Sequence, residues 1–202
     1  MPERFLSLMC TMKLQLISAV VCLLGITACN NASKSPKELS SQEVLELAGK
    51  SPGMNAGRGT FSVITPAGWT KTDTVMSRIE YTFMMAPPGG DSSFRANVNI
   101  VTQELKQGVT LDKVMETTQK EMENFFVDYR KIGNGERSVA GVKAKWMKCQ
   151  YAHRETGTPL NGEVTILVKN NIAYAITLTT LANDLVKYEP ALEEILGSFT
   201  TK

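Results

Sequence analysis

Short runs that alternate apolar with polar side chains fill most of the sequence between residues 60 and 180, and this two-residue period is what most restricts the fold. Successive side chains on a strand point to opposite faces, so runs of this kind form strands with one buried face. The run at 94–104 has an inward face of Phe94, Ala96, Val98 and Ile100 and an outward face of Arg95, Asn97 and Asn99. The pattern predicts strands at 60–65, 78–86, 94–104, 129–139, 142–153, 161–169 and 172–180.

Glycine and asparagine stand between many of these runs, which favours short antiparallel connections. Both residues accept the positive φ angles that tight turns require. Such turns are expected at Gly133-Asn134-Gly135, at Gly141, at 156–159 and at Asn170-Asn171. The run at 172–180 has apolar or small side chains on both faces, so this strand is expected to be covered on both sides.

Between residues 110 and 127 the apolar period changes from two residues to about 3.6, which predicts an amphipathic helix. Thr110 suits its N-cap, and Asp112 suits the positive end of the helix dipole. A second helix is predicted from Pro190 to Leu196, because proline suits the first helical position and glycine suits the end. A short helix is also predicted at 42–48. Antiparallel strands covered by helices indicate the α+β class.

Three stretches of the chain resemble the PsbP-like and DcrB-like domains. Phe61 to Trp69 resembles their opening F-x-I-x-x-P-x-G-W pattern, Ser138 to Ala144 resembles their central strand–glycine–strand turn, and Tyr188 to Phe199 resembles their terminal helix. The resemblance covers about Gly59 to Lys202. It implies an α/β/α sandwich around a mainly antiparallel sheet and non-catalytic binding to a protein partner. It implies no active-site residues.

The amino-terminal region has the pattern of a bacterial lipoprotein signal. Met12 and Lys13 precede the apolar run 14–26, which is shorter than the about 20 residues that a membrane span needs. The run ends in Ile26-Thr27-Ala28-Cys29, a lipobox in which the thiol of Cys29 receives a diacylglyceryl group. Cys29 is therefore the expected lipidation site.

This signal divides the chain into three expected parts. Residues 1–28 form the signal peptide, with translation starting at Met9 or Met12, residues 29–41 form a flexible polar tether, and residues 42–202 form one PsbP-like domain. The expected location is the cell envelope, with the lipid anchor in the membrane. Asn30 follows the cysteine where an aspartate would retain an enteric-type lipoprotein in the inner membrane, so the outer membrane is favoured where there are two.

The charge of the chain gives no sign of a nucleic-acid partner. The signal peptide removes Arg4, Lys13 and Glu3 from totals of 22 basic and 20 acidic side chains, which leaves 20 and 19. Nucleic-acid-binding domains instead gather a basic excess on one face. The stretch Lys143 to Lys148 is the densest basic one, and its alternation indicates a solvated strand face. No nucleotide site is expected at Gly49-Lys50-Ser51, because the preceding glycine of a phosphate-binding loop is missing.

The residue types that carry most enzyme and metal chemistry are scarce. Cys149 is the one cysteine left in the mature domain, so no disulfide is expected, and His153 is the one histidine. On one strand they would lie about 13 Å apart, at about 3.3 Å per residue, which is too far for a Cys–His pair or a shared metal. Cys149 is interpreted as a core residue and His153 as a surface residue at a strand end. The carboxylates of Glu121, Glu123 and Glu193-Glu194 are interpreted as solvent-facing.

The sequence therefore predicts no catalytic residues, no metal site and no cofactor, and it identifies no ligand-binding residues. The favoured hypothesis is a membrane-anchored, non-enzymatic envelope lipoprotein that binds another envelope protein as an accessory module. The alternative is a lipoprotein that binds a small molecule or a lipid in a cleft beside the sheet, lined by Met84, Met85, Phe125 and Phe126.

Overall fold

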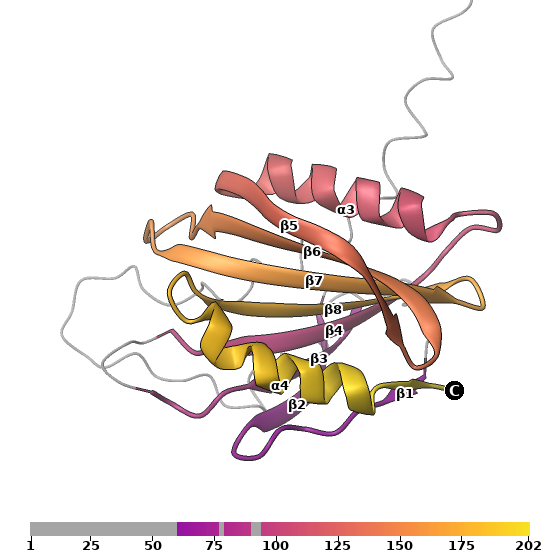
Figure 1. Cartoon of the computed structure of the whole chain (residues 1–202), viewed down its shortest axis with the longest axis horizontal. Coiled ribbons are helices and arrows are strands. Elements are labelled where there is room, and N and C mark those ends of the chain that lie inside the picture. The colour runs from indigo at the N-terminus through magenta and orange to yellow at the C-terminus, as the bar shows by residue number, and fades with distance from the viewer. Residues whose placement is uncertain (1–59, 77–78, 90–93) are drawn as a thin grey trace, which may run out of the picture.

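The structure is a computed structural model, and it describes residues 60–76, 79–89 and 94–202. The expected signal peptide, lipidation site, tether and helix at 42–48 lie outside these residues. Seven strands form one antiparallel sheet in the order β2-β3-β4-β8-β7-β6-β5, and β1 pairs with β9 in a separate small sheet (Figure 1). None of the described helices is long and apolar enough to cross a membrane.

Nine strands and two helices make up the described part of the chain. The strands are β1 (Phe61–Ser62), β2 (Thr70–Met76), β3 (Ile79–Met85), β4 (Asn97–Glu104), β5 (Val127–Val139), β6 (Val142–Ala152), β7 (Pro159–Lys169), β8 (Ile172–Leu181) and β9 (Thr200–Thr201). The helices are α3 (Leu111–Phe125) and α4 (Leu185–Ser198). These elements confirm the α+β class and six of the seven predicted strands, whereas the strand predicted at 60–65 is reduced to the two residues of β1.

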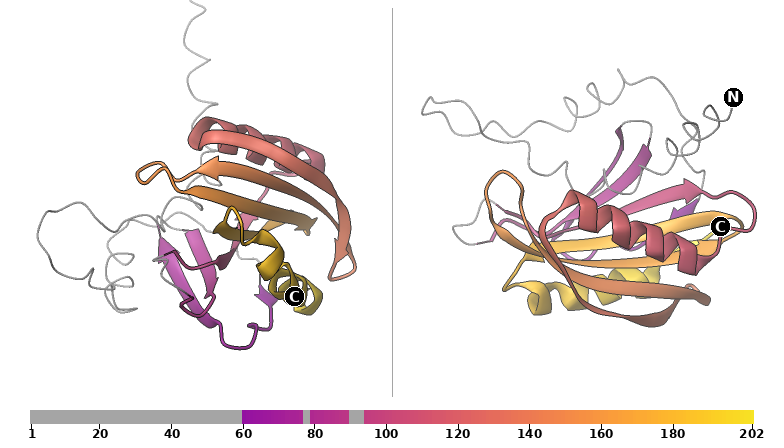
Figure 2. Two further views of the ribbon diagram at one scale, coloured as in Figure 1. Left: turned by 60° about the vertical axis from the view of Figure 1, so that its left-hand side comes forward. Right: turned by 90° about the horizontal axis from the view of Figure 1, so that it is seen from above.

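The two helices cover opposite faces of the sheet, and Figure 2 shows them on its two sides. Strand β8 lies in the middle of the sheet and is buried on both faces, as predicted. Its Tyr174 and Ile176 belong to the core beneath α4, while the alternate residues Ala173 and Ala175 belong to the core beneath α3. The layers are therefore helix, sheet and helix, which confirms the α/β/α sandwich.

Helix α3 begins where the sequence predicts. The side chain of Thr110 accepts a hydrogen bond from the backbone N–H of Lys113 at 3.3 Å, which satisfies one of the free donors at the helix start. Val114, Thr118 and Met122 are its buried residues. The helix thus packs on the sheet through the stripe that its 3.6-residue period predicts.

The prediction that the last helix starts at Pro190 and ends before Gly197 is wrong. Helix α4 starts at Leu185 and ends at Ser198, so both residues lie inside it. Leu185 is buried with Leu192 in the core beneath α4. The burial of Leu185 stabilises the five helical residues that precede Pro190. Proline deprives the carbonyl of Val186 of its helical partner, but Val186 is 77% exposed, so that carbonyl can bind water.

The prediction of a turn at Gly133-Asn134-Gly135 is also wrong, because these residues lie inside β5. The other predicted turns form: Ala140-Gly141 has φ of 53° and 72°, Asn170-Asn171 has φ of 52° and 60°, and Gly157 between β6 and β7 has φ of 67°. Strand β5 pairs with β6 in a register that shifts twice, between Val127 and Arg130 and between Lys131 and Gly133. Gly133 and Gly135 are therefore paired strand residues, opposite Lys148 and Trp146 of β6.

The outward placement of Asn97 and Asn99 is a further prediction that fails. Both side chains are only 1% exposed, because both faces of β4 are buried. Alternation in this strand therefore separates a polar buried face from an apolar buried face. Among the described residues, neither side-chain atom of the Asn99 amide has a hydrogen-bond partner.

Candidate functional site

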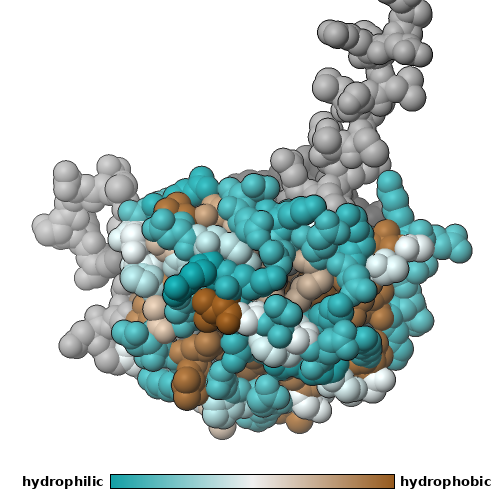
Figure 3. All heavy atoms as spheres, turned by 45° about the horizontal axis from the view of Figure 1, so that its top comes forward, coloured by the Kyte–Doolittle hydropathy of each residue, from teal (hydrophilic) through white to brown (hydrophobic). Residues whose placement is uncertain are grey.

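An open groove of about 460 Å³ runs between helix α3 and the β5–β6 strands. Its size falls within the range of about 300–1,000 Å³ that binding sites occupy. Figure 3 shows this side of the molecule as mainly hydrophilic, with hydrophobic atoms in small separate patches. We call this feature the α3–β5 groove; its lining residues are Asp112, Met115, Glu116, Gln119, Lys131, Asn134, Gly135, Glu136, Lys145, Trp146 and Met147.

The indole of Trp146 on β6 lies on the face of the sheet opposite the α3–β5 groove, where it passes over glycine residues of β5. A Cβ atom on Gly135 would lie 2.8 Å from the ring, closer than any real Cβ contact, whereas one on Gly133 would lie at an ordinary 3.5 Å. Arg137 and Lys148 lie over the same ring, at 5.6 Å and 5.8 Å from its centroid. These contacts hold the ring in one position at the edge of the sheet.

The charged residues of the α3–β5 groove neutralise one another. Lys145 forms ion pairs with Asp112 from α3 and with Glu136 from β5. A hydrogen bond from Lys145 lowers the pKa of Asp112, and one from Lys143 lowers the pKa of Glu136. Hydrogen bonds from Lys120 and Lys113 likewise lower the pKa of Glu116 to about 2. These three carboxylates are therefore ionised at neutral pH, and their lysine partners leave the groove with little unbalanced charge.

A buried carboxylate lies on the other face of the sheet, beneath α4. The side chain of Glu163 on β7 is 2% exposed; it accepts a hydrogen bond from Arg137 Nη2 at 2.7 Å and lies 3.3 Å from Lys148 Nζ. Helix α4 supplies two more carboxylates, with Glu193 at 3.0 Å from Arg137 and Glu189 at 2.6 Å from Lys148. We call these five residues the α4 network. It joins α4 to the outer strands.

The stretch interpreted as a solvated basic face is therefore only partly solvated. Lys143 is 65% exposed, but Lys145 and Lys148 are 28% and 26% exposed and reach opposite faces of the sheet. Carboxylates from helices α3 and α4 bind them there. This basic stretch thus serves to fasten both helices to β6.

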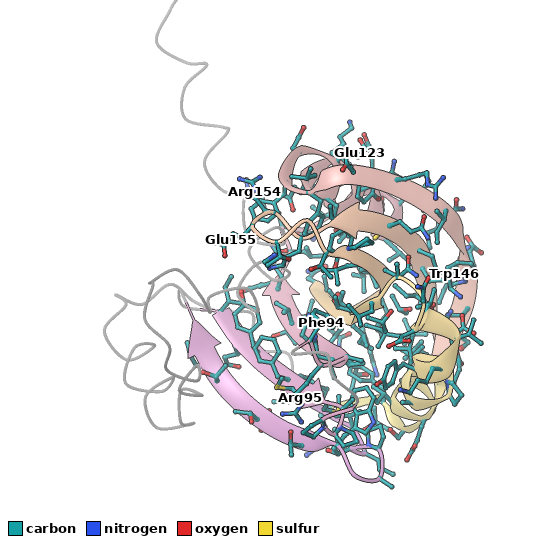
Figure 4. The ribbon with its side chains drawn as sticks, turned by 90° about the vertical axis from the view of Figure 1, so that its left-hand side faces the viewer. Phe94, Arg95, Glu123, Trp146, Arg154 and Glu155 are labelled. Atoms are coloured by element: carbon teal, nitrogen blue, oxygen red, sulfur yellow. The ribbon has the colours of Figure 1, made fainter. Side chains whose placement is uncertain are left out.

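The four residues expected to line a cleft beside the sheet do not meet. Met84 is fully buried in the core beneath α4, whereas Phe126 stacks on Tyr151 on the α3 side, with ring centroids 4.1 Å apart. Phe125 lies under Arg154, which also donates to its carbonyl at 2.7 Å. Figure 4 shows Arg154 at one side of the molecule and Trp146 at the other, beside α4. These aromatic residues fasten the end of α3.

The space between α3 and the middle of the sheet is an apolar cavity of about 20 Å³. A cavity needs about 10–15 Å³ measured in this way to hold one water molecule. Val101, Val114, Met122, Ile166 and Ala175 are among its walls. A lipid chain could enter only if α3 moved away from the sheet.

Glu121 on α3 is not the solvent-facing carboxylate that the sequence indicates. Its Oε2 atom is buried without a hydrogen-bond partner in the described structure, and burial raises the pKa of Glu121 from 4.5 to about 7. Because the pKa of Glu121 is higher in the folded protein than in the unfolded chain, the folded state is the more stable while this carboxyl group is protonated. Its contribution is complete below about pH 4.5 and is lost as the pH rises through about 7.

The stability of the protein should therefore fall between about pH 5 and about pH 8, and Glu121→Gln should flatten that fall, because the amide does not ionise. Urea unfolding of both proteins at the two pH values measures the effect. Equal pH dependence in the two proteins would show that Glu121 is solvated in the folded state.

Cys149 and His153 lie where the sequence places them. The thiol of Cys149 is fully buried and donates to the carbonyl of Gly162 at 3.6 Å, and burial raises the pKa of this thiol to about 12. His153 follows the end of β6, where its Nδ1 atom lies 3.1 Å from the hydroxyl of Thr156 in the β6–β7 turn. Within the described residues, no three His, Cys, Asp or Glu side chains gather as a metal site would require.

The comparison with protein families decides the relationship of this chain. The family described as "Probable lipoprotein LpqN" matches residues 43–202. The chain belongs to this lipoprotein family. The LpqN match includes the whole α/β/α sandwich and begins 17 residues before Thr60, the first described residue.

Solved structures agree with the LpqN family and with the resemblance to PsbP-like domains. The crystal structure of LpqN, involved in cell envelope biogenesis of Mycobacterium tuberculosis, has a TM-score of 0.61 and 15% identity, and the match covers 73% of this chain and 86% of LpqN. Cyanobacterial PsbP (CyanoP) from Synechocystis has a TM-score of 0.50 and 11% identity, and the match covers 74% of this chain and 95% of CyanoP. A protein of unknown function from Pseudomonas aeruginosa has a TM-score of 0.50 and 17% identity, and the match covers 68% of this chain and 93% of that protein.

At these identities the likeness shows a common fold, and membership of the LpqN family supports an envelope location. No curated protein matches the sequence significantly. The α3–β5 groove and the α4 network were both missed by sequence reasoning. One signal was available: Glu163 is the one acidic residue of β7, and an acidic residue inside a buried strand requires a cation as partner.

Proposed function

We propose that the protein is a membrane-anchored, non-enzymatic lipoprotein that binds another envelope protein through the α3–β5 groove. The observation that carries this proposal is an open groove in which Met115 and the buried Met147 lie within a polar border. Protein interfaces have an apolar centre and a polar rim, and aromatic residues and methionine are enriched in them.

The charges of the groove indicate the chemistry of the partner. Since Asp112, Glu136 and Lys145 already bind one another, a strongly charged partner would have to break these pairs. A partner segment of low net charge that places an apolar side chain beside Met115 fits the groove best. Such a partner segment can be either folded or extended.

The proposed lipid anchor rests on the lipobox, and substitution of Cys29 tests it. In cells fed a palmitate analogue, the wild-type protein should become labelled, whereas Cys29→Ser should not, because the serine hydroxyl is no substrate for thioether formation. Fractionation of the two membranes then locates the labelled protein, with the outer membrane expected where there are two. An unlabelled wild-type protein would overturn the anchor.

The binding part is tested by photo-cross-linking in intact cells. A cross-linking amino acid at position 119, in the groove, should capture a defined envelope protein, while one at the exposed position 194 on α4 should not. Equal capture from both positions, or capture from neither, would contradict the proposal. Lipid that copurifies in native mass spectrometry, without cross-linked protein, would favour the small-molecule or lipid-binding alternative instead.

A further inference from the structure

The two edges of the large sheet differ in how well they are protected. At one edge, β5 shifts register twice against its neighbour. At the other edge, β2 pairs with β3 at all seven of its residues, from Thr70 opposite Met85 to Met76 opposite Ile79, without a bulge. Bulges and unpaired charges keep other strands away from an edge. Strand β2 has no bulge, and its two charged side chains, Lys71 and Asp73, form an ion pair with each other at 3.4 Å.

The ladder shows which backbone groups of β2 face outward. Ala86 donates to the carbonyl of Ala96 at 2.9 Å, so the even-numbered residues of β3 turn their backbone groups toward β4. Odd-numbered residues of β3 therefore bond to β2, and their partners there are Thr70, Thr72, Thr74 and Met76. The backbone groups of Lys71, Asp73 and Val75 consequently point away from the sheet.

These three outward residues form a regular row of backbone donors and acceptors that no residue of the described ranges uses. In the described parts of the chain, no backbone hydrogen bond reaches the outer side of β2. The side chains of Lys71, Asp73 and Val75 are 38%, 65% and 43% exposed, so they can also contact a neighbour. An edge of this kind is a template for one more strand.

We propose that the β2 edge binds an extended segment of a partner protein, which adds a strand beside Lys71, Asp73 and Val75. The inference rests on the proposed function in taking the partner to be a protein, but its surface is separate from the α3–β5 groove, since β2 and β5 are opposite edges of the sheet. The backbone supplies the affinity of such a contact, and alternate side chains supply its specificity.

The side chains favour a partner over a second copy of this chain. An antiparallel pair of β2 strands that matched all seven residues would place Asp73 directly opposite Asp73, and like charges opposite one another destabilise a sheet. The segment that fits has a basic residue opposite Asp73, an acidic residue opposite Lys71 and an apolar residue opposite Val75.

The test is cross-linking from single positions of β2 in the full-length protein in intact cells. A photo-cross-linking amino acid is placed at 71, 73 or 75, and the captured peptides are mapped by mass spectrometry. Strand addition predicts that all three positions cross-link to one segment of the partner. When the cross-linker moves by two residues along β2, the cross-linked residue of the partner should also move by two residues. Cross-links without this register, or to a second isotope-labelled copy of the chain, would overturn the inference.

Val75→Pro tests the backbone contacts directly. Proline removes an outward N–H that the β2–β3 ladder does not use, so the domain should fold normally. Cross-linking from position 71 should fall by about tenfold, because one hydrogen bond is lost and the ring obstructs the added strand. Val75→Thr keeps the N–H and is the matched control, expected to cross-link like the wild type. Unchanged cross-linking in the proline variant would overturn the inference.

A second variant guards against misfolding of the first. Lys71→Glu combined with Asp73→Lys keeps the ion pair on β2 but exchanges its signs, and it should also weaken capture from position 75. If capture persists from position 119 but fails from all three positions of β2, the edge inference fails and the groove proposal stands. If no position captures a protein, both fail.

Discussion

Replacing Glu163 by alanine should lower the free energy of unfolding by about 3 kcal/mol, because removal of one partner leaves buried charges uncompensated. The carboxylate lies between Arg137 and Lys148, and both cations are largely covered by α4 and the sheet. Without it they would keep only the more exposed carboxylates of Glu193 and Glu189. Urea unfolding followed by circular dichroism measures the change.

The matched control is Glu193→Ala, which removes a carboxylate from the same Arg137. The side chain of Glu193 is 66% exposed, and exposed ion pairs contribute only about 0–1 kcal/mol. The stability of this variant should therefore stay close to that of the wild type. If the two variants were equally destabilised, the burial of Glu163 would not be the cause of its effect.

Replacing Gly135 by alanine should destabilise the protein by about 1–3 kcal/mol, the usual cost of overpacking. Its methyl group would lie 2.8 Å from the indole of Trp146, so the ring or strand β5 must move. The ring is also held by Arg137 and Lys148, which restricts that movement. Urea unfolding measures the loss, and the fluorescence spectrum should change as the ring environment changes.

Gly133→Ala is the control for this experiment, because the same methyl group would meet the ring at 3.5 Å, an ordinary contact. Both glycines lie in β5, so both variants change strand propensity equally. Only Gly135→Ala should lose stability by more than about 1 kcal/mol. A similar loss in Gly133→Ala would point to the backbone of β5 in place of the indole.

The elements of this fold could be predicted because their side-chain periods are local. The stripe of α3, its Thr110 cap and the turn at Asn170-Asn171 each depend on a few neighbouring residues, and each lies where the pattern predicts. The errors arose where a distant contact decides. Gly135 is a glycine because Trp146, eleven positions away, passes over it, and no turn is involved.

Burial on both faces of the sheet explains the other errors. Alternation predicts which residues share a face, but it does not say whether the polar face meets solvent. For Asn99 the predicted face of the strand was correct, but the prediction that this face meets solvent was wrong. Pro190 lies inside a helix because the core contacts of Leu185 extend that helix toward its start. The α4 network was beyond reach for the same reason: Arg137 and Glu163 lie 26 residues apart.

The position of β8 has a consequence for how the chain is completed during synthesis. This strand is the eighth of the nine described in chain order, yet it lies between β4 and β7 at the centre of the sheet. Until residues 172–181 have left the ribosome, β4 and β7 each lack the neighbour that joins the two halves. The sandwich can therefore close only after these residues have emerged, and a nascent chain stopped before Ile172 has two additional open edges, β4 and β7, that invite aggregation.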